Sequence, residues 1–256
     1  MYKIDRAFMD GNPRYISTRI GFGEGLVQAG EKDNNVVALC ADLTESIQMQ
    51  DFKNKFGNRF IEVGVAEQNL VTVASGMARA GKIPFAASYA SFSPGRNWEQ
   101  IRTTICLNNM PVRLVGSHAG VTVGPDGATH QMLEDIAMMR ALPNMIVLDP
   151  GDAIEAKKAT IAMANLNKPS YVRLCRDKTA IFSTNESPFE IGKAYVLRSG
   201  TDVTLFGTGI MTVELLSAAK ILDSNGINVE VVHIPTIKPL DEKTILSSIE
   251  KTGRAV

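Results

Sequence analysis

Short apolar runs alternate with helical segments through most of this chain, and this alternation constrains the fold more than any other feature of the sequence. Five runs predict buried strands, at 36–41, 82–87, 112–116, 145–148 and 170–174. Four segments between them predict helices, at 67–80, 97–108, 132–141 and 153–165. Strands that alternate with helices favour an α/β fold, in which helices cover a mostly parallel sheet.

A polar segment rich in turn-forming residues divides the chain into two predicted domains. It reads Ser-Thr-Asn-Glu-Ser-Pro-Phe-Glu from 183 to 190, a composition typical of linkers. We therefore expect a larger domain over 1–182, a linker over 183–191 and a smaller α/β domain over 192–256. The smaller domain is predicted to contain two strands and two helices, at 203–206, 229–234, 211–222 and 242–249.

The charge and hydrophobicity of the chain exclude several classes of function. Lysine plus arginine equal aspartate plus glutamate at 27 each. This balance, without a long block of one sign, gives no support for a nucleic-acid or membrane surface. The N-terminus lacks an apolar signal core, and no apolar stretch approaches the roughly 20 residues that a membrane span needs. We therefore expect a cytoplasmic protein with a well-developed core.

The cysteine and histidine positions argue against a metal site. Three cysteines lie far apart in apolar sequence: Cys40, Cys106 and Cys175. Cysteines of this kind are typically buried thiols of a reducing compartment. His118, His130 and Asp126 might be read as zinc ligands, but no Cys or His pair has metal-site spacing. We expect no metal site from this chain alone.

The stretch 59–69 reads Arg-Phe-Ile-Glu-Val-Gly-Val-Ala-Glu-Gln-Asn and places an acid at the predicted start of a helix. Glu67 would lie there among free backbone N–H groups, at the positive end of the helix dipole. A glutamate in a first helical turn is usually only a favourable partner of the dipole. A functional interpretation of Glu67 therefore depends on other motifs.

Two loops supply such motifs. The loop 42–46 follows a predicted parallel strand, at the end where ligands gather in such sheets. The loop 117–131 contains two of the three histidines together with three glycines and a proline. Fifteen residues without periodicity inside a compact domain usually form a functional loop.

Glycines interrupt the sequence at two informative places. Gly21, Gly23 and Gly25 fall in a segment predicted to be helical from Tyr15 to Ala29, where each costs about 1 kcal/mol relative to alanine. We expect them to allow close packing against another backbone. The turn 207–209, Gly-Thr-Gly, lacks the third glycine of a dinucleotide fingerprint, so it gives only a weak indication of phosphate binding.

Three motifs together resemble a known family. They are the stretch 62–69, the aromatic pair Tyr89 and Phe92 before Pro-Gly-Arg, and the stretch 124–131. In this order they resemble the pyrimidine-binding half of transketolases, and the residues after the linker resemble the transketolase C-terminal domain. More closely, the chain resembles the C-terminal subunit of split transketolases. The resemblance implies a pyrimidine-type, thiamine-diphosphate-binding domain with a mostly parallel sheet, followed by a smaller α/β C-terminal domain that lacks the family's last strands.

The resemblance also implies cofactor-binding residues. In this family a glutamate hydrogen-bonds N1′ of the aminopyrimidine ring of thiamine diphosphate and favours the tautomer that accepts the C2 proton, and Glu67 matches that position. Tyr89 and Phe92 match the aromatic shelf for the ring, although such a pair can also be plain core packing. Asp42 completes the residues expected at the cofactor.

Substrate contacts follow from the same resemblance. Four residues match positions that contact the sugar phosphate: Arg19, Ser46, His118 and Arg176. Taken singly, either arginine would more simply be a solvated surface charge. Asp126 and His130 match residues near the sugar hydroxyls, where proton transfer accompanies cleavage of the carbon–carbon bond. Glu67, Asp126 and His130 are therefore the expected catalytic residues.

One signature of the family is missing from the chain. The Gly-Asp-Gly segment with a downstream Asn, which holds Mg²⁺ and the diphosphate, does not occur. The resemblance thus implies a partner, an N-terminal transketolase subunit that carries the diphosphate and Mg²⁺ site, in an α2β2 assembly. The expected reaction moves a two-carbon ketol unit from a ketose phosphate to an aldose phosphate, and only with that partner present.

Two other functions are compatible with the sequence. The β subunit of a 2-oxoacid dehydrogenase shares the fold and the activating glutamate, and it would decarboxylate a 2-oxoacid instead. A non-catalytic partner subunit of the same fold is the second alternative. The presence of Glu67, Asp126 and His130 together argues against a decayed site.

Overall fold

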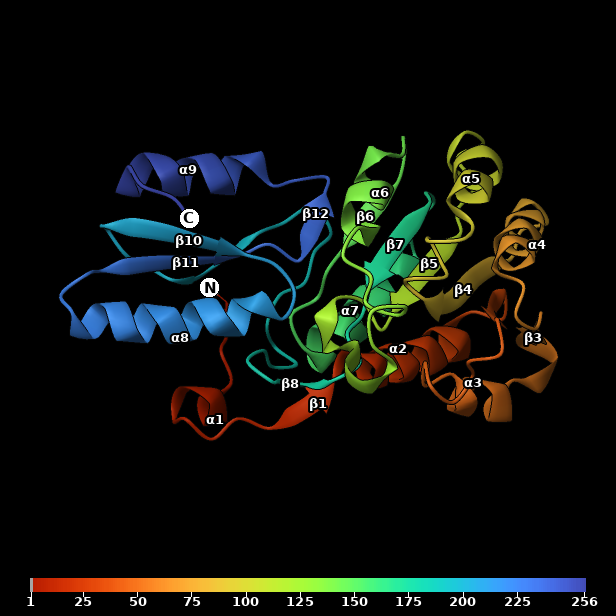
Figure 1. Cartoon of the computed structure of the whole chain (residues 1–256), viewed down its shortest axis with the longest axis horizontal. Helices are drawn as coiled ribbons and strands as arrows, with labels where there is room; N and C mark the ends of the chain where they lie inside the picture. The colour runs from red at the N-terminus through yellow and green to blue at the C-terminus, as the bar shows by residue number, and fades with distance from the viewer. Residues whose placement is uncertain (1) are drawn as a thin grey trace.

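The computed structural model describes residues 2–256, and a seven-stranded sheet is its main feature (Figure 1). The strands lie in the order β12-β6-β7-β5-β4-β2-β3, and all neighbours are parallel except β12 and β6. Their bounds are β2 Val36–Cys40, β3 Phe60–Glu62, β4 Ile83–Tyr89, β5 Arg113–Ser117, β6 Ile146–Leu148, β7 Ser170–Arg173 and β12 Thr236–Lys238. The expected α/β fold with a mostly parallel sheet is confirmed.

Helices cover both faces of this sheet, which explains why its strands are continuous apolar runs. One face carries α2 (Thr18–Lys32), α3 (Gln50–Lys55) and α7 (Ala153–Ala164). The other carries α4 (Glu67–Arg79), α5 (Trp98–Gln100) with the π-helix Ile101–Cys106, and α6 (Asp135–Ala141). Along β2, Ala38 and Cys40 join the first core, whereas Val37 and Leu39 join the second. This alternation is the two-residue period of a strand.

The segment predicted to be one helix from Tyr15 is a short strand followed by a helix. β1 (Tyr15–Ser17) pairs antiparallel with β8 (Lys178–Ala180), and α2 begins at Thr18. The Ser17 hydroxyl caps the helix by accepting a hydrogen bond from the backbone N–H of Arg19. Two further short helices are α1 (Arg6–Met9), which precedes β1, and the 3₁₀ helix Gly57–Arg59, which lies between α3 and β3.

The glycines of α2 allow close packing against neighbouring backbone, as the sequence predicted. A Cβ atom at Gly21 would lie 1.8 Å from the carbonyl oxygen of Ala153 in α7. At Gly23 it would lie 2.3 Å from the carbonyl oxygen of Gln48, in the segment before α3. No side chain fits at such distances, so α2 and its neighbours approach through backbone atoms.

Residues beyond the polar segment form a three-stranded sheet between two helices (Figure 1). Its strand order is β10-β11-β9, with β10 parallel and β9 antiparallel to β11. The elements are β9 Tyr195–Arg198, β10 Val203–Gly207, α8 Met211–Ser224, β11 Val229–His233 and α9 Glu242–Thr252. The predicted strands and helices are therefore present, and β9 is an additional strand. β12 follows β11 and leaves this sheet to pair with β6 of the larger one.

A buried polar network joins the two parts of the molecule. Glu155 of α7 is fully buried and accepts a hydrogen bond from the Tyr2 hydroxyl at 2.6 Å. Its second oxygen lies 2.8 Å from Nε2 of His233 in β11 and accepts a bond from the Gly151 N–H. Although burial favours the protonated acid, the neighbouring His233 and these hydrogen bonds lower the pKa of Glu155. The network links the N-terminal segment, the large sheet layer and the small sheet.

None of the helices in residues 2–256 is both long enough and apolar enough to cross a membrane. The three cysteines are buried and free, as predicted. Burial raises the pKa of Cys40 to about 11 and that of Cys106 to about 12. Within the same described residues, no group of three or more His, Cys, Asp or Glu side chains is placed to hold a metal ion.

Candidate active site

The predicted site residues gather at the carboxyl edge of the large sheet. The loop 42–46 follows β2, Glu67 follows β3, Tyr89 ends β4, and His118 follows β5. In the sheet, β3 lies on one side of β2 and β4 lies on the other. The chain therefore leaves β2 toward β3 and leaves β4 toward β5 in opposite directions, which makes the gap between β2 and β4 a switch point. Such a switch point leaves a crevice at the carboxyl ends of the strands, where open α/β sheets bind ligands.

Glu67 is the first residue of α4 and its side chain is only 4% exposed. Both carboxylate oxygens accept hydrogen bonds from Nη1 of Arg96, at 3.1 and 3.2 Å. The backbone carbonyl of Glu67 accepts a further bond of 2.8 Å from the Asn97 side-chain amide. The acid is therefore held in position from both its backbone and its side chain.

The two predicted aromatic residues lie beside the predicted histidines. Tyr89 stacks on His118 with ring centroids 3.8 Å apart, and its hydroxyl lies 2.6 Å from Oγ of Ser46. The ring centroid of Phe92 lies 5.9 Å from that of Tyr89 and 5.1 Å from that of His130, and the Phe92 and His130 rings meet edge to face. Both aromatic rings are partly exposed, so they line the edge of the sheet rather than fill its core.

Two arginines and a histidine lie close together next to these rings: Arg19, Arg176 and His118. Nη2 of Arg19 donates to the backbone carbonyl of Arg176 at 2.9 Å, and Nη1 donates to the carbonyl of Ser46. His118 is 1% exposed, and its Nδ1 lies 2.9 Å from the Ser117 hydroxyl. Burial, together with the charges of Arg19 and Arg176, lowers the pKa of His118 to about 3. Burial, and after it the charge of Arg176, lower the pKa of Arg19.

The loop 117–131 is ordered by backbone contacts. It contains a 3₁₀ segment, Val121–Asp126. Nη1 of Arg176 donates to the carbonyl of Val123 at 2.8 Å, and the Gly120 N–H donates to the carbonyl of Met132. Asp126 is exposed at the end of the 3₁₀ segment. Nδ1 of His130 lies 2.8 Å from the Thr129 hydroxyl.

Asp42 lies at the outer margin of this group. It is exposed, with a positive φ of 60°. Its backbone N–H donates to Glu62 at 2.7 Å, and the same carboxylate oxygen accepts from the Gly64 N–H at 3.0 Å. Glu62 thus fixes the loop after β2 relative to the segment before α4.

The structure adds Arg96 and Glu62 to the residues that the sequence indicated. Arg96 follows the aromatic pair in the same motif, but its contact with Glu67 spans 29 residues and has no local signal. Glu62 ends β3, and its carboxylate reaches across to the loop after β2. Both contacts depend on the parallel pairing of strands, which a single sequence does not specify residue by residue.

The Asp149 side chain packs against the Gly-Thr-Gly turn at 207–209. Oδ2 of Asp149 accepts a hydrogen bond of 3.2 Å from the Thr208 hydroxyl, and the Gly209 N–H donates to the Asp149 carbonyl. Burial raises the pKa of Asp149 to about 6. An acidic side chain in the turn makes it unsuitable for phosphate.

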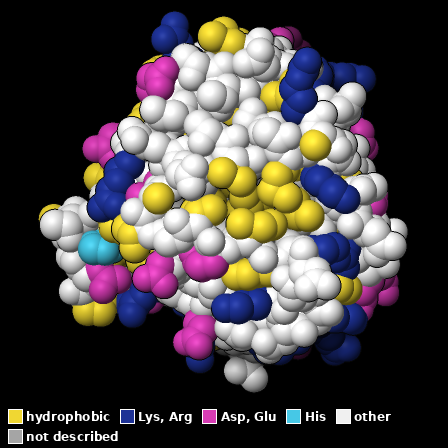
Figure 2. All heavy atoms as spheres, turned by 90° about the vertical axis from the view of Figure 1, so that its right-hand side faces the viewer, with side chains coloured by type: hydrophobic (Ala, Val, Ile, Leu, Met, Phe, Trp, Pro, Cys, Tyr) yellow, Lys and Arg dark blue, Asp and Glu magenta, His cyan; other side chains and the backbone are white. Residues whose placement is uncertain are grey.

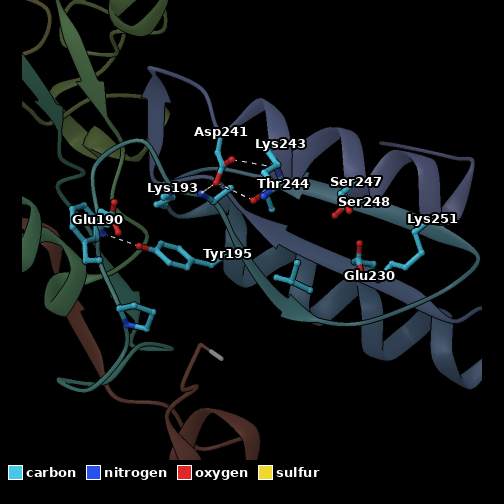
Figure 3. A pocket seen from close by; sticks show the side chains of 14 residues that line it. Glu190, Lys193, Tyr195, Glu230, Asp241, Lys243, Thr244, Ser247, Ser248 and Lys251 are labelled. Carbon is cyan, nitrogen blue, oxygen red and sulfur yellow. Dashed lines mark hydrogen bonds and ion pairs between the residues drawn. The ribbon is translucent and has the colours of Figure 1, made fainter.

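A wide hollow of about 770 Å³ lies in the C-terminal part, and no predicted site residue lines it (Figure 3). Asp241 accepts hydrogen bonds there from the Ala194 N–H at 3.0 Å and the Thr244 hydroxyl at 2.9 Å. The Tyr195 hydroxyl accepts from the Glu190 N–H at 2.7 Å. These contacts hold α9 and the polar segment against the small sheet.

The fold and the site together define a class of protein. A buried acid, two partly exposed aromatic rings and a group of cations lie at the carboxyl edge of a parallel sheet. This arrangement is typical of an α/β enzyme with its active site in the crevice beyond the strands.

The chain belongs to the transketolase family. Residues 14–180 match the transketolase pyrimidine-binding domain, and residues 192–256 match the transketolase C-terminal domain. Homologues in this family support a transferase-type enzyme, and the family implies dependence on thiamine diphosphate.

Curated relatives agree with this assignment. A protein of Methanocaldococcus jannaschii described as a transketolase C-terminal section is 46% identical over 236 residues, which are 91% of this chain and 75% of that protein. A 6-deoxy-6-sulfo-D-fructose transketolase subunit of a Clostridium species is 38% identical over 90% of this chain and 72% of its own. Human transketolase is 37% identical over 93% of this chain, which spans 38% of the human protein.

Solved structures show the same fold. A split-gene transketolase, described as an inactive β4 tetramer, has a TM-score of 0.87 and 40% identity over 94% of this chain and 78% of that chain. Transketolase from Campylobacter jejuni has a TM-score of 0.83 and 27% identity, over 95% of this chain and 39% of its own.

Proposed function

We propose that this chain is one subunit of a thiamine-diphosphate-dependent transketolase. The proposed reaction transfers a two-carbon ketol unit from a ketose phosphate to an aldose phosphate. The observation that supports it most is the buried carboxylate of Glu67 at the start of α4, beside a partly exposed aromatic pair. In the proposal, 1–182 is the pyrimidine-binding domain, 183–191 the linker and 192–256 the C-terminal domain.

The residues at the sheet edge fit the aminopyrimidine end of the cofactor. Thiamine diphosphate, when bound, supplies an acidic ring carbon that can add to a ketose carbonyl. Glu67 is buried, so it would hold a proton in a fixed position at the ring nitrogen. Phe92 and Tyr89 would hold the ring by stacking, and Asp42 lies at the margin of the same edge.

The two neighbouring arginines suit an anionic substrate. Arg19 and Arg176 lie within each other's field, and both lower the pKa of the neighbouring His118. An anion placed among them would relieve this repulsion and would accept hydrogen bonds from the guanidinium groups. We assign the sugar phosphate to Arg19, Ser46, His118 and Arg176. Asp126 and His130 are assigned to the hydroxyl groups near the reacting carbonyl, where they would position or exchange protons.

The proposed partner is an N-terminal transketolase subunit that holds the diphosphate and Mg²⁺, in an α2β2 assembly. The relative described as a C-terminal section and the split-gene structural neighbour support this arrangement. Hydrophobic side chains gather at the centre of the face on which β3 and α4 lie (Figure 2). Val65, between these two elements, is 69% exposed. A contiguous apolar patch on a surface is a common mark of a protein interface.

The identity of the anion can be tested directly. The Clostridium relative is described as acting on a sulfonated sugar, and a sulfonate could occupy the same cationic site as a phosphate. We propose phosphate, because a phosphate monoester carries a charge of about −1.5 to −2 at neutral pH, which suits two guanidinium groups better than the single charge of a sulfonate. Steady-state kinetics with fructose 6-phosphate and 6-deoxy-6-sulfofructose would compare the two donors, and a much larger kcat/KM for the sulfonate would refute phosphate.

The proposed role of Glu67 gives the first prediction. In the assembly with its partner, thiamine diphosphate and Mg²⁺, Glu67→Gln should lower the kcat of ketol transfer by a factor of about 10² to 10⁴, the usual contribution of a positioned acid–base group. Ketol transfer is measured in a coupled assay. Glu99→Gln, a change at an exposed position of α5, serves as the control and should keep full activity. Near wild-type turnover in Glu67→Gln would refute the assignment.

A further inference from the structure

We propose that the Arg96 side chain occupies the place of the cofactor's aminopyrimidine ring. In this stand-in role, Arg96 must be displaced by the ring before the ring can bind. The proposal rests on the function proposed above and concerns the same site. It assigns to Arg96 a role in setting the affinity for the cofactor. Nothing in the local sequence indicates this role.

The contacts of the Arg96 guanidinium carry the proposal. Its Nη1 donates to both carboxylate oxygens of Glu67, at 3.1 and 3.2 Å. The carbon atom of the same guanidinium lies 4.1 Å from the centroid of the Phe92 ring. One planar group that bears N–H donors therefore pairs with the acid and covers the aromatic face at the same time.

An aminopyrimidine ring would need the same two contacts. It is also planar, and in the proposed function its N1′ nitrogen shares a proton with Glu67 while the ring lies against Phe92. Arg96 engages both residues, so the ring and the guanidinium compete for them. Binding of the ring then requires that the arginine side chain leave.

The arginine side chain is free to leave without a change in the fold. It is half exposed, and its hydrogen bonds among the described residues go to Glu67. The surrounding backbone is fixed independently, because the Arg96 N–H donates to the Phe92 carbonyl and the Asn97 side chain bonds both Glu67 and Ser93. Arg19 differs, since its guanidinium is tied to two backbone carbonyls.

The physical role of the contact is to compensate a buried charge. An isolated carboxylate that is almost fully buried is costly, and Glu67 would be such a group before the cofactor arrives. Arg96 pairs with it in the meantime. Because the arginine is half exposed, the pair is screened by water and only moderately strong. A moderately strong contact can be exchanged for the cofactor.

The test measures the affinity for thiamine diphosphate in the assembly with the partner subunit and Mg²⁺. Arg96→Met keeps most of the side-chain length but removes the competing guanidinium, so the dissociation constant should fall by about two- to fivefold, as expected for loss of a partly exposed ion pair. Arg96→Lys should lie between Arg96→Met and the wild type, because an ammonium cannot stack and pair as a planar group. Arg102→Met, at an exposed position of the π-helix, is the matched control and should bind as the wild type does. Titration calorimetry gives all four constants.

A second measurement uses the single chain and a fragment of the cofactor. The probe is 4-amino-5-hydroxymethyl-2-methylpyrimidine, at millimolar concentration. Thermal shift or NMR should show binding to Arg96→Met and much weaker binding to the wild type. Circular dichroism checks that the variant is folded.

The outcomes separate this proposal from the proposed function. If the wild-type assembly binds thiamine diphosphate and Glu67→Gln loses turnover, yet Arg96→Met binds no tighter than the wild type, the stand-in role of Arg96 is refuted and the function stands. If the wild-type assembly fails to bind thiamine diphosphate, both are refuted. Tighter binding by Arg96→Met, with Arg102→Met unchanged, supports the stand-in.

Discussion

At the scale of single residues, the site combines a buried acid with two nearby arginines. Glu67 has a cationic partner in Arg96, whereas Arg19 and Arg176 both lower the pKa of the buried His118. The two environments therefore differ in charge: the acid is paired with a cation, and the histidine is held neutral beside two cations.

His118 gives a pH-dependent prediction at this scale. Its pKa is lowered from 6.5 to about 3 in the folded chain, first by burial and then by Arg19 and Arg176. Between these two pH values the unfolded chain binds the proton and the folded chain does not, so lowering the pH favours unfolding. Relative to His118→Asn, the wild type should lose up to about 1.4 kcal/mol of unfolding free energy per pH unit below 6.5.

Urea denaturation at pH 7 and pH 5 measures this difference. Asparagine suits the replacement because it tolerates the positive φ of 57° at this position. The comparison between variant and wild type cancels the titration of the carboxylates that both share. Parallel pH profiles for the two proteins would show that His118 is not held neutral by its surroundings.

Much of the site could be predicted at the residue scale because three motifs carry it. Glu67, Tyr89, Phe92 and the loop 117–131 lie at one edge of the sheet, where the order of strands and helices placed them. Their roles stay predictions until the variants are measured. The contact of Arg96 with Glu67 could not be predicted, because it depends on how the loop after β4 folds back over the start of α4.

At the scale of elements, helix packing through glycine is the feature most open to experiment. Gly21→Ala in α2 would place a Cβ 1.8 Å from the Ala153 carbonyl oxygen, so α2 and α7 would have to separate. We expect a loss of at least about 3 kcal/mol in unfolding free energy, or failure to fold, because well-packed cores yield little.

Gly76 in α4 provides the matched control for this change. A Cβ at Gly76 would meet nothing within 4 Å, and the residue lies inside a helix. Gly76→Ala should therefore stabilise the protein by about 0.5 to 1 kcal/mol. Chemical denaturation of both variants measures the two effects. Equal stabilities for Gly21→Ala and Gly76→Ala would contradict the packing argument.

The elements that the sequence missed share a physical reason. β1 and β12 are three-residue strands whose partners, β8 and β6, lie far away in the chain. Three residues carry no periodic signal, and pairing over such distances is decided by the rest of the fold. The long buried strands were predictable because burial on both faces makes them continuous apolar runs.

At the scale of the whole molecule, the Glu155 network joins the part that contains the large sheet to the small sheet, and we expect it to stabilise both. Glu155→Ala would leave the Tyr2 hydroxyl, the Gly151 N–H and His233 without their common acceptor in a buried site. The unfolding free energy should fall by about 3 to 5 kcal/mol, as for other buried partners removed singly.

The control for this change is an exposed ion pair between α2 and α7. Glu24 of α2 lies 3.0 Å from Lys157 of α7, and both side chains are substantially exposed. Glu24→Ala should change the unfolding free energy by about 1 kcal/mol or less. Urea curves followed by circular dichroism give both values. A Glu155→Ala protein as stable as Glu24→Ala would show that the buried network does not join the two parts.

The position of β12 has a consequence for how the molecule is protected against self-association. An open sheet has two outer strands whose free N–H and C=O groups can recruit another chain. The C-terminal part supplies Thr236–Lys238 as a cover for β6, whereas β3 has no strand beyond it in the described part of the chain. Both outer strands of the large sheet, β12 and β3, are only three residues long, and such short edge strands therefore offer few free groups to another chain.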